Sequence, residues 1–367
     1  MSVLIRTDVA RKDWMELVKG VAIILVVIFH TMLFLRALDY QGGGLGRSKI
    51  AFEPFPMPAF FVITGMFALR VPQWTFAEVW KRRLAQYLYL YVLWSVIRFA
   101  FYLVVPNVRA EDGAGVTASD PLALALIFVW PTSSYWFIYA LLLFTIAVWL
   151  VRKAPIWAQL AGAGVVSVLF SSGLADTHNV GWNRMGEYLV FFVAGVVLSK
   201  RIDRAVAESK PWHVWASLAV SLAVSALLAL VPVSREVPGV ALVAQVASLA
   251  FGFTAAVRLV RLRPLGFLSY LGKRTLDIYL LHVFVIAGLV AVIAMFPQLH
   301  DLGDDGWLVM LVTTTLTIVI SILLFRLLSR FTWLFVSPFR VRPGRSRRGS
   351  RRAEPEPKAL TDATESA

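Results

Sequence analysis

The chain has 367 residues, of which 59% are hydrophobic and only 16% are charged, and its mean hydropathy is +0.72. Apolar runs of about 20 residues recur between short polar connections, which excludes a water-soluble globular protein and predicts an all-α, polytopic transmembrane helix bundle. There is no cysteine, so disulfides and thiol nucleophiles are excluded. The net charge of +14 lies in short connections beside the spans, which argues against nucleic-acid binding.

The apolar runs predict about ten spans, at residues 18–37, 51–69, 84–105, 132–151, 155–174, 185–199, 212–232, 239–257, 275–296 and 307–328. The polar start runs directly into the first span without a small-residue cleavage pattern, so we expect no cleavable signal peptide. Lysine and arginine concentrate in the N-terminal segment, in alternate connections and after residue 325, whereas connections 106–120 and 297–306 are polar and mostly acidic. Because cytoplasmic loops are enriched in lysine and arginine, both termini are predicted to be cytoplasmic.

Two regions are expected, a transmembrane domain at residues 1–336 and a basic tail at residues 337–367. The tail contains the sequence RVRPGRSRRGSRR and then an acidic end with proline, alanine and threonine. It has no apolar face to bury, which predicts disorder. Contact with anionic membrane lipid is its simplest role, and a specific partner is the alternative.

The first span contains two ionisable residues on one helical face. Lys19 and His30 are eleven residues apart, which in an α-helix is three turns plus a small rotation and about 16 Å along the axis. Glu16 lies near the same stripe. Ionisable groups inside a span are costly and usually mark a functional site. A neutral imidazole can take a proton from a hydroxyl group, so we predict that His30 is a general base. A structural hydrogen bond for His30 and a topology charge for Lys19 are the ordinary alternatives.

Pro131 interrupts the apolar run at residues 121–151, which predicts a half-helix at residues 121–130 that re-enters the membrane or lies at its surface. Such a break is tolerated only where protein or a wet cavity surrounds it. Nearby, Arg98 lies well inside the third span and is expected to face the bundle interior or the outer interface.

Other polar and aromatic residues are candidates with weaker signals. Lys81, Arg82 and Arg83 open the third span and form either a topology cluster or a clamp for a phosphate-bearing donor. Five further residues are candidates, namely Trp136, Tyr139, Arg184, Glu187 and His282. Each either belongs to a site or serves packing, anchoring or pairing. His178, His213 and His300 have no partner at ligand spacing, so we predict no metal.

Several segments resemble the membrane-bound acyltransferase-3 family. In the first span, Lys19 is followed by ten residues and then His30. This spacing is similar to that family's signature, in which arginine is usual at the position of Lys19. The sequence PMPAFFVITGMFALR resembles its F-F-x-x-S-G segment, with Thr64 in place of serine and with Gly65 allowing close helix packing. The sequences SSYWFIYALL, NRMGEYLVFFVAGVVLSK and LGKRTLDIYLLH resemble later family segments. One departure is Gln86, three residues after Arg83, where the family often has two arginines.

The resemblance implies an O-acyltransferase of the bacterial inner membrane that uses acetyl-CoA or another acyl-CoA as donor substrate and holds no permanent cofactor. The acceptor would be a hydroxyl of a cell-surface or periplasmic carbohydrate or a lipid-linked precursor. His30 would be the catalytic base. Lys19, Glu16 and the basic cluster 81–83 would bind or orient the donor. Residues on the acceptor or oxyanion side would be Arg98, Trp136, Tyr139, Arg184, Glu187 and His282.

Two other functions remain compatible with the residues. Buried ionisable groups and a broken helix also suit a transporter or flippase of an envelope precursor. This hypothesis predicts paired repeats with interrupted helices in both halves of the chain. A non-catalytic partner of an envelope-biosynthesis complex predicts that His30 tolerates glutamine or asparagine.

Overall fold

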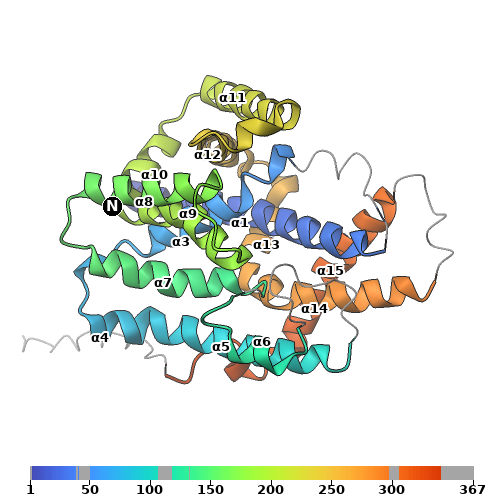
Figure 1. Cartoon of the computed structure of the whole chain (residues 1–367). Helices are drawn as coiled ribbons and strands as arrows, with labels where there is room; N and C mark the ends of the chain where they lie inside the picture. Colours follow the sequence, from blue (N-terminus) through green and yellow to red (C-terminus); the bar gives the residue numbers. More distant parts are fainter. Residues whose placement is uncertain are drawn as a thin grey trace, which may run out of the picture.

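The computed structural model describes residues 2–38, 40, 50–105, 118–131, 133–296 and 306–339, and every regular element in these residues is a helix (Figure 1). This is the expected outcome for apolar runs in lipid, because a helix satisfies all its backbone polar groups within one segment. Most of the predicted acidic connections and most of the predicted tail lie outside the described residues.

Each of the ten predicted spans coincides with a helix. These are α1 (Ser2–Arg36), α3 (Pro56–Phe67), α5 (Ala85–Tyr102), α7 (Trp136–Leu150), α8 (Ile156–Ser171), α9 (Val180–Val197), α11 (Pro211–Leu230), α12 (Val240–Leu259), α14 (Thr275–Ala294) and α15 (Trp307–Leu328). Among the described residues, 7 segments are long and apolar enough to cross a membrane, whereas α7 and α8 are shorter apolar helices. A multi-pass membrane protein is therefore supported, and the number of spans and the side of the termini stay predictions.

Short helices connect the long ones. They are η1 (Val71–Gln73), α4 (Phe76–Val79), the π-helical turn η2 (Trp80–Leu84), α6 (Pro121–Ala125), α10 (Ser199–Ala207), η3 (Pro232–Arg235), η4 (Arg263–Leu265), α13 (Gly266–Lys273) and η6 (Thr332–Leu334). The predicted interruption before α7 is confirmed, whereas the predicted half-helix at residues 121–130 is shorter than expected, since α6 ends at Ala125 and α7 begins at Trp136. The side chain of Asp120 caps α6 by accepting a hydrogen bond from the backbone of Leu122.

Glycines allow the central helices to touch. A Cβ placed on Gly20 of α1 would lie 1.9 Å from the carbonyl oxygen of Leu268 in α13. One placed on Gly65 of α3 would lie 2.3 Å from the carbonyl oxygen of Phe192 in α9. Helices in membranes associate through such small-residue contacts, since lipid removes the hydrophobic drive between them. The close approach predicted at Gly65 is thus confirmed.

The bundle is organised around α1. It packs against α3, α12, α13, α14 and α15, and more than half of its apolar window is buried. In Figure 1, α11 and α12 form the upper edge of the molecule and α5 forms the lower edge. This arrangement leaves α1 in the interior, where polar groups on it can be enclosed by protein.

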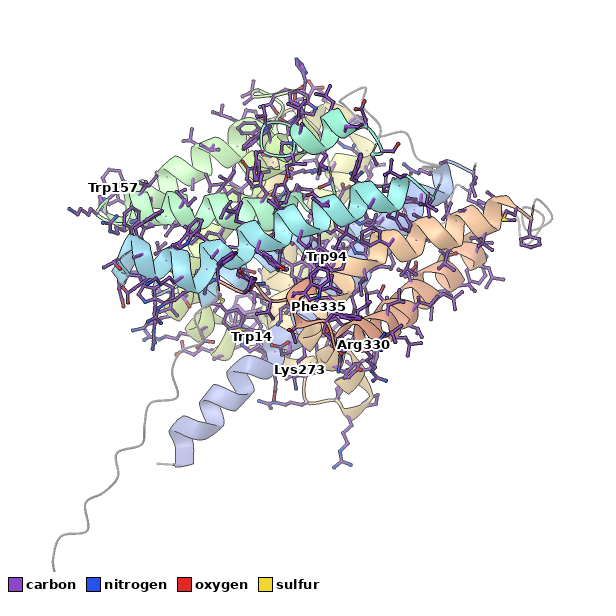
Figure 2. All side chains as sticks on the ribbon, turned by 90° about the horizontal axis from the view of Figure 1, so that it is seen from below. Trp14, Trp94, Trp157, Lys273, Arg330 and Phe335 are labelled. Carbon is purple, nitrogen blue, oxygen red and sulfur yellow. The ribbon has the colours of Figure 1, made fainter. Side chains whose placement is uncertain are left out.

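Contacts join several basic connections to one another. Arg258 donates hydrogen bonds to the hydroxyl and carbonyl groups of Ser209, Arg326 donates to the hydroxyl of Tyr270 at 3.2 Å, and Trp149 donates to the carbonyl of Trp74 at 2.9 Å. We call the end of the bundle that holds these connections and Lys19 the basic end. Arg330 and Lys273 lie together at this end in Figure 2.

We expect Gly65→Ala to destabilise the bundle, because an added methyl group would meet backbone atoms of α9 that cannot move aside. Overpacking of this kind costs about 1–3 kcal/mol. The measurement is the thermal unfolding midpoint in detergent. Gly164→Ala on α8 is the matched control, since a Cβ there meets nothing within 4 Å. Equal midpoints for the two variants would contradict the packing argument.

Candidate active site

The structure brings together two histidines that are far apart in the sequence. His30 of α1 and His282 of α14 have ring centroids 4.9 Å apart and an interplanar angle of 79°, which is an edge contact. His30 is half-buried, whereas His282 has no exposed surface. Part of the His30 side chain is therefore accessible, whereas His282 is enclosed by protein.

Backbone carbonyls set the hydrogen positions of both rings. Nδ1 of His30 lies 2.9 Å from the carbonyl oxygen of Val26, and Nδ1 of His282 lies 2.8 Å from that of Tyr279. A carbonyl only accepts, so Nδ1 donates and carries the proton in each ring. In the neutral imidazole the lone pair is then on Nε2. Nε2 of His282 is buried without a hydrogen-bond partner among the described residues.

A cavity of about 480 Å³ extends from the basic end to a level one turn short of the two histidines. We call it the inner cavity. Along α1 it is lined by Lys19, Ile23 and Val26, and Val26 lies one helical turn before His30. On α14 it reaches Tyr279, whose ring centroid is 5.9 Å from that of His282. Most of its wall is apolar, so it suits a largely apolar group with a polar end at Lys19.

Of the predicted donor residues, Lys19 lines this cavity. Nζ of Lys19 is 2.9 Å from a carboxylate oxygen of Glu16 and 6.0 Å from the ring centroid of Phe67. The ion pair holds Lys19 at the edge of the inner cavity, which it lines. The predicted Glu16–Lys19 stripe is thus present as a contact.

The basic cluster at residues 81–83 does not line the inner cavity itself. Arg83 is the nearest member, because it donates hydrogen bonds to the carbonyl of Phe67 and the hydroxyl of Tyr87, which both line the cavity. Arg82 lies over the ring of Trp74 and 3.7 Å from a carboxylate oxygen of Glu78. Lys81 is exposed.

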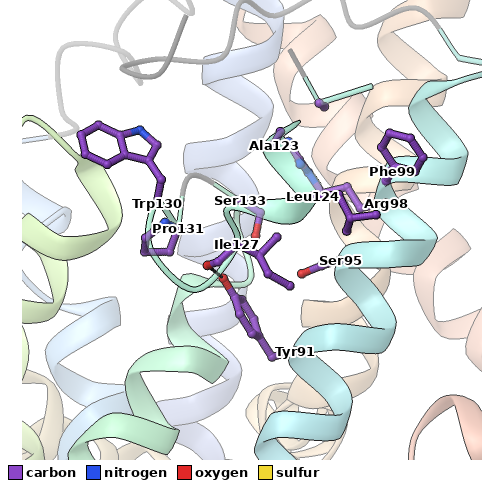
Figure 3. A pocket seen from close by; sticks show the side chains of 11 residues that line it. Tyr91, Ser95, Arg98, Phe99, Ala123, Leu124, Ile127, Trp130, Pro131 and Ser133 are labelled. Carbon is purple, nitrogen blue, oxygen red and sulfur yellow. Dashed lines mark hydrogen bonds between the residues drawn. The ribbon is translucent and has the colours of Figure 1, made fainter. Parts of the chain in front are cut away.

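A second, smaller hollow lies near the break before α7 (Figure 3). Arg98 and Ser95 of α5 line it together with Ser133, and the Arg98 guanidinium also lies over the ring of Tyr102 at 5.3 Å. The hydroxyl oxygens of Ser95 and Ser133 are buried without hydrogen-bond partners among the described residues. The volume of about 20 Å³ holds about one water molecule. Arg98 thus faces the bundle interior, in a polar space too small for a sugar ring.

Arg184 and Glu187 are paired, which was one of the two predicted alternatives. Nη1 of Arg184 is 2.8 Å from a carboxylate oxygen of Glu187, and Nη2 is 3.7 Å from one of Glu53. Gln245 of α12 donates a hydrogen bond of 2.5 Å to Glu187. The network joins α9 and α12 to the segment before α3.

Trp136 and Tyr139 both pack inside the bundle. Tyr139 stacks on Tyr91 with ring centroids 4.8 Å apart and donates a hydrogen bond to the carbonyl of Phe128. Trp136 stacks on Tyr188 with a centroid distance of 6.1 Å. Neither of them lines the inner cavity or the smaller hollow.

Several residues of this region escape the sequence analysis, namely Glu53, Gln245, Tyr279 and Phe335. Gln245 is a single amide in the apolar run VALVAQVASLAFG, so a search for polar residues inside predicted spans could find it. Phe335 carries no such signal. Among the described residues, no group of three or more histidine, aspartate or glutamate side chains could hold a metal ion, and the expectation of no metal stays a prediction.

Comparison with known proteins places the chain in a family. No curated protein and no solved structure matches it. The family model of the acyltransferase-3 group, described as an acyltransferase domain, matches residues 12–326, which is most of the chain and includes α1 with both Lys19 and His30. The chain therefore belongs to the acyltransferase-3 family.

Proposed function

We propose that this protein is an integral membrane O-acyltransferase that moves an acyl group, acetyl in the first instance, from acyl-CoA to a hydroxyl of a cell-surface or periplasmic carbohydrate. Its place would be the bacterial inner membrane, with the basic end in the cytoplasm, as the distribution of lysine and arginine predicts. One observation carries the proposal: the inner cavity leads from Lys19 to within one helical turn of the His30–His282 pair. The family membership supports acyl transfer as the reaction class.

The geometry supports His30 as the general base. Its Nδ1–H is held by the carbonyl of Val26, so Nε2 can take the proton of the acceptor hydroxyl. The hydroxyl oxygen attacks the thioester carbonyl, and the C–S bond breaks as the new ester forms. The proton on His30 then passes to the departing thiolate, which leaves as free coenzyme A. His282 keeps the His30 ring in place through the edge contact.

The donor would enter from the basic end with its thioester ahead. The anionic phosphates of coenzyme A would remain at Lys19, and Arg83 lies close to the same mouth through its bonds to Phe67 and Tyr87. The apolar wall suits the pantetheine arm. The length of α1 from Lys19 to His30, about 16 Å, would place the thioester beside the base.

The acceptor would approach from the end opposite Lys19. Arg98 lies on that side of α5, near the break at Pro131, and is the candidate to stabilise the oxyanion or to hold the acceptor. The Arg184–Glu187 network is the second polar group available to a carbohydrate. The packing of Trp136 and Tyr139 inside the bundle favours a structural role over sugar stacking for both.

Transport of an envelope precursor is the second candidate, and the interrupted helix at Pro131 is the observation that favours it. The two functions differ in one product. An acyltransferase releases coenzyme A when an acceptor is present, whereas a transporter does not.

We expect His30→Ala to lower the rate of acceptor-dependent coenzyme A release by at least about 100-fold, because general-base catalysis contributes about 10²–10⁴-fold. His282→Gln should lower kcat by less, since an amide of similar size preserves the packing against His30. The measurement is coenzyme A release by purified protein in nanodiscs, with an envelope-carbohydrate extract or water as acceptor. The thermal unfolding midpoint of each variant is the control for folding. Equal rates for His30→Ala and wild type would remove His30 from the mechanism.

We expect Lys19→Gln to raise the KM for acyl-CoA by slightly more than about tenfold and to change kcat little. Loss of one charge-assisted contact with a phosphate is worth about 1.5 kcal/mol. The measurement is the KM and kcat of coenzyme A release at low ionic strength. Lys153→Gln is the matched control, because Lys153 is exposed and does not line the inner cavity. An equal rise in KM for both variants would indicate a general effect of charge, and no rise for Lys19→Gln would remove this residue from donor binding.

A further inference from the structure

The segment that follows α15 turns back onto α5. We call residues 331–339 the strap. Three side chains of α5 donate hydrogen bonds to backbone carbonyls of the strap, at 2.8–2.9 Å. Gln86 donates to Phe335, Tyr89 to Trp333 and Trp94 to Leu334. The amide of Ser337 in turn donates to Gln86 at 2.9 Å. The strap is therefore fastened to the bundle by side chains more than 200 residues away in the sequence.

Phe335 is the buried centre of the strap. Its ring lies 4.6 Å from that of Phe325 in α15 and 5.9 Å from that of Trp94 in α5, and only 8% of it is exposed. Figure 2 shows Phe335 and Trp94 side by side. The strap thus fills the space between α15 and α5 and joins the two helices.

Two apolar hollows lie on opposite faces of α5 at the level of the strap. Gln86, Tyr87 and Leu90 line the inner cavity together with Phe335 and Val336. The next positions around the helix line an outer groove of about 410 Å³, which ends at the strap residue Phe339. This groove is lined by Trp80, Ala85, Leu88, Tyr89, Val92, Leu93, Val96 and Phe339.

We expect the outer groove to face lipid. It is apolar almost throughout, and its members Trp80 and Val96 are 42% and 44% exposed. Acyl chains of the bilayer fit such a surface. The inner cavity is also largely apolar, so a gap between α15 and α5 would let lipid chains into it.

We propose that the strap closes the inner cavity to the bilayer, with Phe335 as the specificity-determining residue that excludes lipid acyl chains. The cavity then opens toward Lys19 and takes a water-soluble thioester from the basic end. The statement about the donor rests on the proposed function, whereas the closure does not. The strap lies beyond residues 12–326 that the family model matches, so this wall is supplied by the chain's own C-terminal segment.

The chain contains no cysteine, which allows a single reporter to be placed without other changes. Leu141→Cys on α7 puts a thiol on the wall of the inner cavity, and Leu93→Cys on α5 puts one in the outer groove. Each is labelled with a small fluorophore. The protein is placed in nanodiscs whose phosphatidylcholine carries a nitroxide on the acyl chain, which quenches fluorophores that it touches.

Lipid should quench the Leu93→Cys reporter strongly and the Leu141→Cys reporter weakly. Adding Phe335→Ala should raise the quenching of the Leu141→Cys reporter at least about twofold, because the ring that fills the gap is removed. Gln86→Ala should act in the same direction by releasing Phe335 and Ser337. Trp333→Ala is the matched control, since this aromatic residue of the strap is 51% exposed and does not line the inner cavity.

Equal quenching of the Leu141→Cys reporter with and without Phe335→Ala, in protein that remains folded, would overturn the closure. Strong quenching of this reporter in protein with an unaltered strap would also overturn the closure. The donor is tested separately by KM: Phe335→Ala should raise the KM for acyl-CoA about fivefold in phospholipid nanodiscs, as lipid chains compete for the cavity. If the wild-type protein releases no coenzyme A while the quenching follows the expectation, the proposed function fails and the closure stands.

Discussion

The close contact between α1 and α13 is the constraint on which the site depends. A Cβ on Gly272 of α13 would lie 1.7 Å from the carbonyl oxygen of Glu16, and one on Gly20 would lie 1.9 Å from that of Leu268. With no side chain between them, the backbones touch. Since α14 follows α13 after a single residue, this contact also sets the position of α14 beside α1. It thereby brings His282 to the edge of the His30 ring.

The same packing explains how ionisable groups are tolerated in an apolar bundle. Lys19 meets Glu16 within its own helix, and Arg184 meets Glu187 in the same way. Pairing one turn apart lowers the cost of burying these charges, and the Arg184–Glu187 pair also binds Glu53 and Gln245 from other segments. The histidines differ, because Nδ1 of each ring bonds a carbonyl of its own helix, and the two rings meet edge to face between α1 and α14.

Two hollows inside the bundle differ in polarity and in size. The inner cavity is apolar, about 480 Å³, and begins at a lysine, whereas the hollow near Arg98 is polar and holds about one water molecule. Under the proposed function, the donor would occupy the first hollow. The second is too small for a sugar ring, so an acceptor there would require the segment around the break at Pro131 to move. An interrupted helix suits that role, because its backbone carbonyls are bound by side chains and not by the next turn of the helix. The hydroxyls of Tyr91 and Tyr139 donate to the carbonyls of Ile127 and Phe128.

Sequence alone determined the features that depend on one helix at a time. The apolar runs located the ten helices that match predicted spans, Pro131 located the break, and helical spacing placed Lys19, Glu16 and His30 on one stripe, because local backbone rules decide these points. The sequence did not predict which helices pair. Glu53 and Gln245 bind the Arg184–Glu187 pair, His30 contacts His282, and the strap with Phe335 binds α5. These contacts join segments that are 50 to 250 residues apart. Only the tertiary structure decided these contacts, since close packing at glycines, and not any local pattern, selects which helical faces meet.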